Sequence, residues 1–98
     1  MYKDVISYEL APGITEAHLL SVAQRIINSW MKQVPGFIRW EINKGHDGGY
    51  TDVVFWESVE HAKAAEKDMI NIPDAHEWYG CYKDGSIKAF GMHQLAEF

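Results

Sequence analysis

The pattern of apolar and polar positions divides the chain into six stretches that are typical of strands or helices. Loose period-two alternation and β-branched residues indicate strands, and apolar residues at three- and four-residue steps indicate helices. The predicted elements are, in order, a strand over 3–10, a helix over 16–33, strands over 37–44 and 50–56, a helix over 59–69 and a strand over 86–95.

Both predicted helices have recognisable ends. Thr15 and Ser58 each precede a helical stretch and are good N-cap residues. Pro35-Gly36 ends the first helix, and the second stops before Pro73. Residues 75–84 are ambiguous, and we expect one short helical turn followed by a loop.

The two central strands should form a hairpin, because Asp47-Gly48 lies between them. A two-residue turn or a four-residue loop gives the same register. The expected neighbours on one face are Trp40 with Phe55 and Ile42 with Val53. On the other face they are Arg39 with Trp56, Glu41 with Val54 and Asn43 with Asp52.

The order β-α-β-β-α-β predicts a ferredoxin-like α+β fold, with a four-stranded antiparallel sheet and both helices on one face. The chain forms one domain over residues 1–98. In the expected register both faces of the sheet hold large apolar side chains, since Phe37, Tyr50, Val54 and Trp56 lie opposite the Trp40 face. A monomer would expose an apolar patch. We therefore expect a homodimer that packs sheet against sheet.

Composition narrows the function classes. The chain has 98 residues, a formal net charge of -5 and no basic run, which argues against a nucleic-acid partner, including an RNA-recognition type with the same strand order. It has one cysteine, no secretory signal and no apolar run of about 20 residues. We expect a cytoplasmic protein that neither spans nor binds a membrane.

Three short motifs point to a family. They are Pro35-Gly36-Phe37 after the first helix, the strand Asp52–Trp56, and Trp56-Glu57-Ser58 before an alanine-rich helix. With these motifs the chain resembles the antibiotic biosynthesis monooxygenase-like group of the dimeric α+β barrel superfamily, over nearly its whole length. The resemblance implies two subunits that close their sheets into a barrel, each with a ligand pocket between its sheet and helices.

Relatives in this superfamily oxidise polycyclic phenols with O₂ and no cofactor, degrade haem, or act as isomerases or cyclases. The haem-degrading branch has an Asn on the first strand, a Trp in the second helix and a His soon after it. Here the first strand offers Ser7 and Tyr8 and the helix offers Ala64 and Ala65, so only His76 matches. Haem degradation is therefore disfavoured.

The segment around His76 is the densest group of reactive and aromatic side chains. A cofactor-free oxygenase needs a base that deprotonates a phenol or enol, and a histidine suits this role. Trp78, Tyr79 and Trp56 would form the flat walls of the pocket. The plainer interpretation is a loop that packs aromatic residues over the core while His76 stays solvated.

Two further residues are candidates for the site. His93, in the last strand, could serve as a base or an orienting donor, or simply be a half-buried strand residue. Arg39 could bind a carboxylate or enolate of the substrate. Glu41 and Asp52 are expected on the same face as Arg39. The plainer interpretation is therefore that these three residues form ion pairs in a dimer interface.

No pair of histidines has the spacing of a metal site, Cys81 lacks a flanking base, and no glycine-rich phosphate loop is present. The leading hypothesis is a homodimeric enzyme that oxidises an aromatic or enolisable metabolite without a cofactor. The alternative is a non-catalytic protein of the same fold that binds a small ligand or acts in a stress response.

Overall fold

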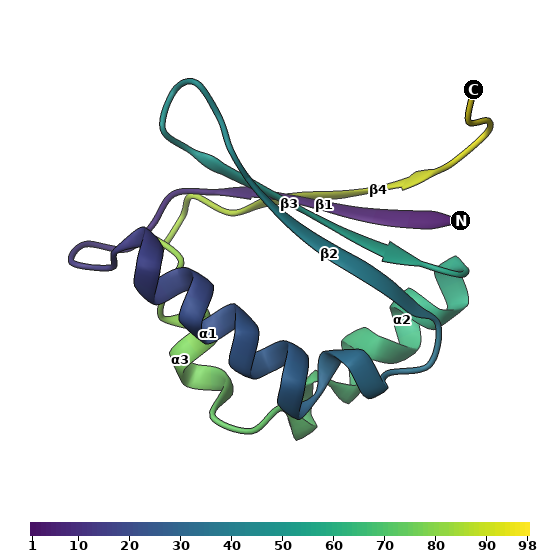
Figure 1. Ribbon diagram of the computed structural model, residues 1–98, viewed down its shortest axis with the longest axis horizontal. Helices are drawn as coiled ribbons and strands as arrows, with labels where there is room; N and C mark the ends of the chain where they lie inside the picture. Colours follow the sequence, from purple (N-terminus) through teal and green to yellow (C-terminus); the bar gives the residue numbers. More distant parts are fainter.

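A computed structural model describes residues 1–98 and shows a four-stranded antiparallel sheet with its helices on one face (Figure 1). The strand order is β2-β3-β1-β4. The elements are β1 (Tyr2–Tyr8), α1 (Glu16–Ser29), η1 (Met31–Gln33), β2 (Phe37–Lys44), β3 (Tyr50–Trp56), α2 (Val59–Asp68), η2 (Met69–Asn71), α3 (Ala75–Tyr79) and β4 (Lys88–His93). The predicted α+β ferredoxin-like fold is confirmed. None of the helices is long and apolar enough to cross a membrane.

The first helix is shorter than its apolar pattern predicts. Thr15 Oγ1 accepts a hydrogen bond from the His18 amide at 3.1 Å, as its N-cap position predicts. The regular helix ends at Ser29, and η1 follows it. Trp30, between them, donates from Nε1 to Asp68 Oδ2 at 2.7 Å. This bond ties the end of α1 to the end of α2.

The two loops that carry the sequence motifs contact each other. The Glu57 amide donates to the Gly36 carbonyl at 2.8 Å, and the rings of Phe37 and Trp56 meet edge to face at 5.8 Å. Gly36 has a φ of 82°, and a Cβ there would overlap the His61 ring on α2. The motifs therefore fix how β2 enters the sheet and where α2 begins.

The register of the β2–β3 hairpin differs by one residue from our prediction. Trp40 pairs with Val54 and Ile42 with Asp52, rather than with Phe55 and Val53. The Gly45 amide donates to the Gly49 carbonyl, which leaves a three-residue loop with Gly48 at a φ of 87°. Three-residue hairpins use such a left-handed residue, and an odd loop shifts the register by one.

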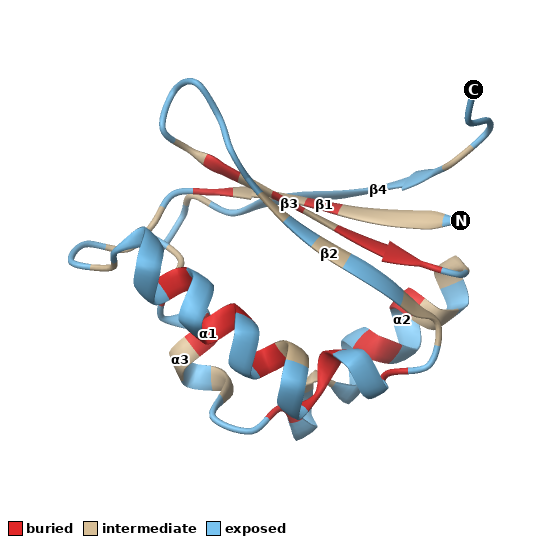
Figure 2. Ribbon diagram, in the orientation of Figure 1, coloured by how far each residue is buried: buried red, intermediate tan, exposed pale blue.

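A one-residue shift moves side chains to the other face of a sheet. Trp40 therefore shares the helix-facing side with Asp52, Val54 and Trp56, and β3 is largely buried there (Figure 2). Our prediction that Tyr50, Val54 and Trp56 lie on the face opposite Trp40 was wrong. So was the grouping of Asp52 with Arg39 and Glu41.

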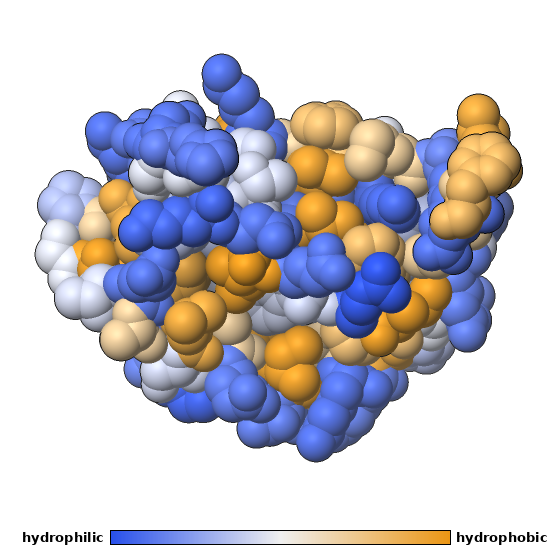
Figure 3. Space-filling model, turned by 45° about the horizontal axis from the view of Figure 1, so that its top comes forward, coloured by the Kyte–Doolittle hydropathy of each residue, from blue (hydrophilic) through white to orange (hydrophobic).

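The outer face of the sheet is apolar at its centre and partly covered by charged side chains (Figure 3). Phe55 lies beneath Arg39, whose guanidinium is 3.8 Å from the ring centroid, and it is buried. Phe90 and Met92 on β4 remain 56% and 43% exposed. This face therefore leaves apolar area exposed, as predicted. The residues that expose it, however, are not the ones that the sequence suggested.

The short helix α3 confirms the helical turn expected around His76. It follows Asp74, which adopts a left-handed conformation with a φ of 53°. Glu77 forms an ion pair with Arg25 of α1, and Cys81 Sγ donates to the Glu77 carbonyl at 3.3 Å. These contacts hold α3 beside α1 and turn Trp78 inward.

Candidate functional site

A cavity of about 460 Å³ lies between the sheet and the helices. Its walls are mainly aromatic, and all four tryptophans of the chain take part. The aromatic residues that line it are Tyr2, Trp30, Trp40, Trp56, Trp78, Tyr79 and Tyr82. Small-molecule sites of this size commonly combine such apolar walls with a few polar groups.

Asp52 is the buried charged residue of the chain and lines this cavity, with 2% of its surface exposed. Its two carboxylate oxygens accept separate hydrogen bonds. The Tyr8 hydroxyl donates to Oδ1 at 2.8 Å, and Trp40 Nε1 donates to Oδ2 at 3.0 Å. Each oxygen keeps a second lone pair for a ligand.

Burial raises the pKa of Asp52 from its ordinary 3.8 to about 6, against the opposing effect of its two hydrogen bonds. Burial and the negative charge of Asp52 also raise the pKa values of Tyr8 and Tyr82 well above their usual range. Both tyrosines therefore stay protonated at neutral pH. Asp52 can exchange a proton near neutral pH, which an acid–base catalyst requires.

A second carboxylate, Asp4, lines the cavity from β1. Trp56 Nε1 donates to Asp4 Oδ2 at 3.1 Å. Burial raises the pKa of Asp4, and the nearby Glu66 on α2 adds to that effect, while the bond from Trp56 opposes it. Two carboxylates thus enter one aromatic cavity from neighbouring strands.

Trp78 presents an unsatisfied donor. Its side chain lines the cavity and is 9% exposed, and its Nε1–H lies near the Tyr82 hydroxyl without making a hydrogen bond of good geometry within the protein. Its ring lies 5.4 Å from that of Trp40 and 5.7 Å from that of Tyr79, between centroids. Buried donors without partners are rare in native proteins, and a ligand acceptor would satisfy this one.

The structure separates the residues that the sequence suggested for the site. Trp56, Trp78 and Tyr79 are brought together as cavity walls. His76 is exposed and is not among the lining residues. His93 is also exposed and does not line the cavity, and its ring lies 5.1 Å from that of Tyr2, which does. Arg39 lies on the outer face of the sheet, over Phe55.

Sequence reasoning missed Asp52 and Asp4 as cavity residues, together with Trp30, Trp40, Tyr2 and Tyr82. For Asp52 the signal was present in the sequence. Tyr50, Asp52, Val54 and Trp56 alternate along β3, so one carboxylate falls on a strand face that is otherwise aromatic and aliphatic. The register error hid this pattern by placing those residues on the face opposite Trp40.

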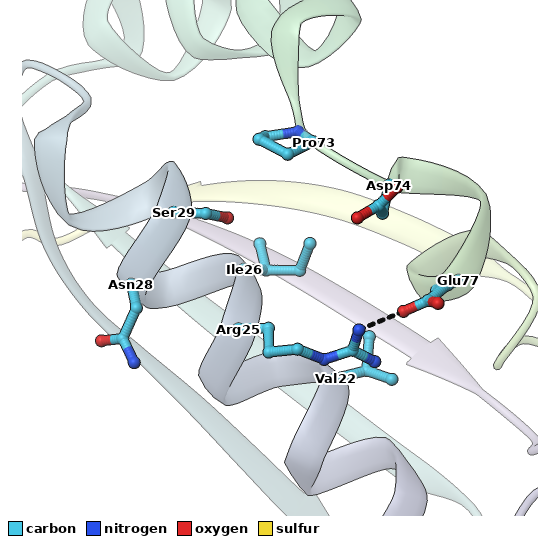
Figure 4. A pocket seen from close by; sticks show the side chains of 8 residues that line it. All are labelled: Val22, Arg25, Ile26, Asn28, Ser29, Pro73, Asp74 and Glu77. Atoms are coloured by element: carbon cyan, nitrogen blue, oxygen red, sulfur yellow. Dashed lines mark ion pairs between the residues drawn. The ribbon is translucent and has the colours of Figure 1, made fainter.

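A smaller groove of about 380 Å³ lies between α1 and α3 (Figure 4). The Arg25–Glu77 ion pair crosses it, and Asn28, Ser29 and Asp74 make its wall polar. Both charged partners are at least one-third exposed. The groove explains how α3 is held and offers no enclosed space for a ligand.

No group of three or more His, Cys, Asp or Glu side chains is placed to hold a metal ion. Cys81 is completely buried, and burial raises the pKa of its thiol. A thiol in this state is a poor nucleophile, since the thiolate is the reactive form.

Comparison with solved structures shows which fold this is. SnoaB, a cofactor-independent oxygenase from Streptomyces nogalater, matches with a TM-score of 0.74 at 17% identity, over 98% of this chain and 94% of that one. The chain has the fold of the antibiotic biosynthesis monooxygenases. The resemblance seen in the sequence is thus confirmed at the level of fold.

Two further structures agree. A monooxygenase from the gene ActVA-Orf6 of Streptomyces coelicolor, crystallised with nanaomycin D, has a TM-score of 0.68 at 18% identity, over 99% of this chain and 89% of that one. An antibiotic biosynthesis monooxygenase matches at 0.63 and 9% identity, over 98% and 100% of the two chains. No family model and no curated protein matches the sequence. At these identities the comparisons establish the fold alone.

Proposed function

We propose that this protein binds a planar phenolic or enolisable metabolite in the cavity between sheet and helices and oxidises it with O₂, without a bound cofactor. The observation that carries this proposal is Asp52. It is a buried carboxylate in an aromatic cavity, with a pKa of about 6 and no cation beside it. The fold shared with cofactor-independent oxygenases supports the same reaction class.

In this mechanism Asp52 is the base. A phenolic O–H in the cavity donates to a free lone pair of the carboxylate, which takes the proton as the phenolate forms. The bonds from Tyr8 and Trp40 hold the carboxylate in one orientation. The Trp78 Nε1–H is a donor for an oxygen that gains negative charge, and such donors stabilise the anion in a dry site.

The electron balance needs no protein redox group. The phenolate reduces O₂, and a new C–O bond forms at the activated ring carbon. Loss of the remaining C–H proton and cleavage of the O–O bond then leave a quinone carbonyl and water. The substrate supplies all four electrons, so a phenol with one reacting C–H and one O₂ give one quinone and one water.

Oxygen uptake tests this assignment. With a panel of naphthols and hydroquinones, the wild type should consume O₂ above the spontaneous rate. Asp52→Asn should lose about 100-fold or more, the usual contribution of a general base. His76→Ala is the matched control and should keep its activity, because His76 does not line the cavity.

Loss of activity in His76→Ala with normal activity in Asp52→Asn would instead make His76 the base. Saturable binding without any oxygen uptake would favour the non-catalytic ligand-binding alternative. Binding itself can be followed by tryptophan fluorescence, because all four tryptophans line the cavity.

We further infer that the protein forms a homodimer through the outer face of its sheet. Phe90 and Met92 supply exposed apolar area on β4, next to the Phe55 and Val5 centre of that face. Burying such area against a second copy is favourable by about 25 cal/mol per Å². A monomeric mass in sedimentation at micromolar concentration would refute the dimer.

A further inference from the structure

We infer that the cavity has a subsite for a positively charged amine at Asp4, which accepts a hydrogen bond from Trp56 Nε1 and lines the cavity together with Tyr2. The preferred ligand is then a planar aromatic molecule with an ammonium group at one end. This inference concerns the ligand class of the cavity described under the proposed function. It requires binding there but no oxidation.

The first argument is a charge imbalance. Asp4, Asp52 and Glu66 line the cavity, and Lys63 is the one cationic side chain among the lining residues. Neither Asp4 nor Asp52 has a lysine, arginine or histidine nitrogen within 4.0 Å, since none of the ion pairs involves them. Carboxylates removed from water are normally paired with a cation, and here the counter-charge is missing.

The second argument is the local geometry of Asp4. Its carboxylate accepts the bond from Trp56 Nε1 on one side. Gly91 on β4 is its partner across the strand pair and has no side chain. A Cβ at Gly91 would overlap the Tyr2 hydroxyl, so the glycine makes the room in which the Tyr2 ring lies.

A carboxylate in a cavity with aromatic walls attracts an ammonium ion by its negative charge, and the walls accommodate the flat part of the same ligand. The other charged groups nearby do not cancel this preference. Glu66 on α2 adds negative charge close to Asp4. Lys63 on the same helix is exposed to solvent, and His93 on β4 packs against Tyr2 rather than Asp4.

The third argument comes from Trp78, an independent observation. Its buried N–H lies near the Tyr82 hydroxyl but makes no hydrogen bond of good geometry within the protein, so a phenolic or carbonyl oxygen of a ligand would be a better acceptor. The ligand therefore carries an oxygen for Trp78 as well as a donor for the carboxylates. An anionic substituent in place of the ammonium would face three carboxylates and is disfavoured.

Matched ligands test the charge preference directly. 1-(Aminomethyl)naphthalene, 1-naphthalenemethanol and 1-naphthoic acid have similar shapes and are cationic, neutral and anionic at pH 7.5. Titrations followed by tryptophan fluorescence should give an amine Kd at least about tenfold below that of the alcohol, with the acid weakest. A tenfold difference is about 1.4 kcal/mol, well within the range of a partly buried charge pair.

Two variants locate the effect. Asp4→Asn should reduce the amine-to-alcohol ratio to about threefold or less, whereas Asp84→Asn changes the net charge equally on the exposed surface and should leave the ratio unchanged. Glu66→Gln, on an exposed helix position, gives a smaller reduction and covers the case in which Asp4→Asn does not fold. Equal binding of amine and alcohol, or a ratio that survives both cavity variants, would overturn the inference. Failure of oxygen uptake would leave it intact and refute only the proposed reaction.

Discussion

Replacing Asp52 by asparagine should stabilise the protein at neutral pH while abolishing its proposed chemistry. The folded state holds this carboxyl with a pKa of about 6, compared with 3.8 for the exposed group. It therefore binds more protons than the unfolded state between these values, so stability falls as the pH rises through that window. Each pKa unit of difference corresponds to about 1.4 kcal/mol. Above pH 7 the buried charge of Asp52 therefore lowers the free energy of unfolding by about 3 kcal/mol.

The Asp52→Asn substitution would remove the charge and keep most of the hydrogen bonds. Trp40 Nε1 can still donate to the new amide oxygen, and the amide nitrogen can donate to the Tyr8 hydroxyl. The Tyr8 proton then loses its acceptor, which costs about 1 kcal/mol. The expected net gain is about 2 kcal/mol at pH 7.5. At pH 4.5 the buried charge destabilises the wild type by only about 1 kcal/mol. The variant and the wild type should then be equally stable.

Urea denaturation at both pH values measures this difference, with Asp84→Asn as the control for net charge. The reasoning fails if the Asp52→Asn variant is less stable than the wild type at pH 7.5. It also fails if the difference between the two proteins does not change with pH.

Three other substitutions have defined outcomes. In urea denaturation, Gly36→Ala should lower the free energy of unfolding by at least about 1 kcal/mol more than Gly13→Ala. Both glycines have a φ of 82°, but only Gly36 faces the His61 ring. Equal losses in the two variants would contradict this packing. Arg25→Ala should lower global stability by less than about 1 kcal/mol, because its ion pair with Glu77 is exposed. It should nevertheless speed hydrogen exchange in α3. Unchanged exchange would mean that the ion pair does not hold the helix. Phe90→Lys should shift the sedimentation coefficient to that of a monomer. Ile70→Lys should not, because Ile70 is 88% exposed and lies away from the sheet. A dimer that persists in Phe90→Lys would place the interface elsewhere.

The element order was predictable because the signals are local. Thr15 and Ser58 cap their helices as expected, and the strands 37–44 and 50–56 have the predicted bounds. Pro35-Gly36 also marks a real boundary, with Gly36 in the left-handed conformation. Caps and turns depend on a few adjacent residues, so a single sequence reveals them.

It was harder to predict which side chains of β2 and β3 share a face of the sheet. A hairpin loop that is longer or shorter by one residue changes which side chains lie together. We expected a loop with an even number of residues, and Gly48 supports one with three. That difference moved Trp40 and Asp52 to the cavity. The site could not be completed from the sequence for the same reason, since Asp4, Asp52 and Trp30 come together only through sheet register and helix packing. His76 stood out in the sequence, yet its place on the outside of α3 is a tertiary property.

The central claim, that Asp52 in the cavity is the base, is tested most directly by the pH dependence of kcat/KM for oxygen uptake. A naphthol substrate remains protonated over the range from pH 4.5 to 8, and the measurement is made on the wild type and on His76→Ala. We predict that kcat/KM rises about tenfold per pH unit up to a pKa of about 6 and then levels off, identically in both proteins. A profile that is flat through pH 6, or a rising limb that disappears in His76→Ala, would contradict the account.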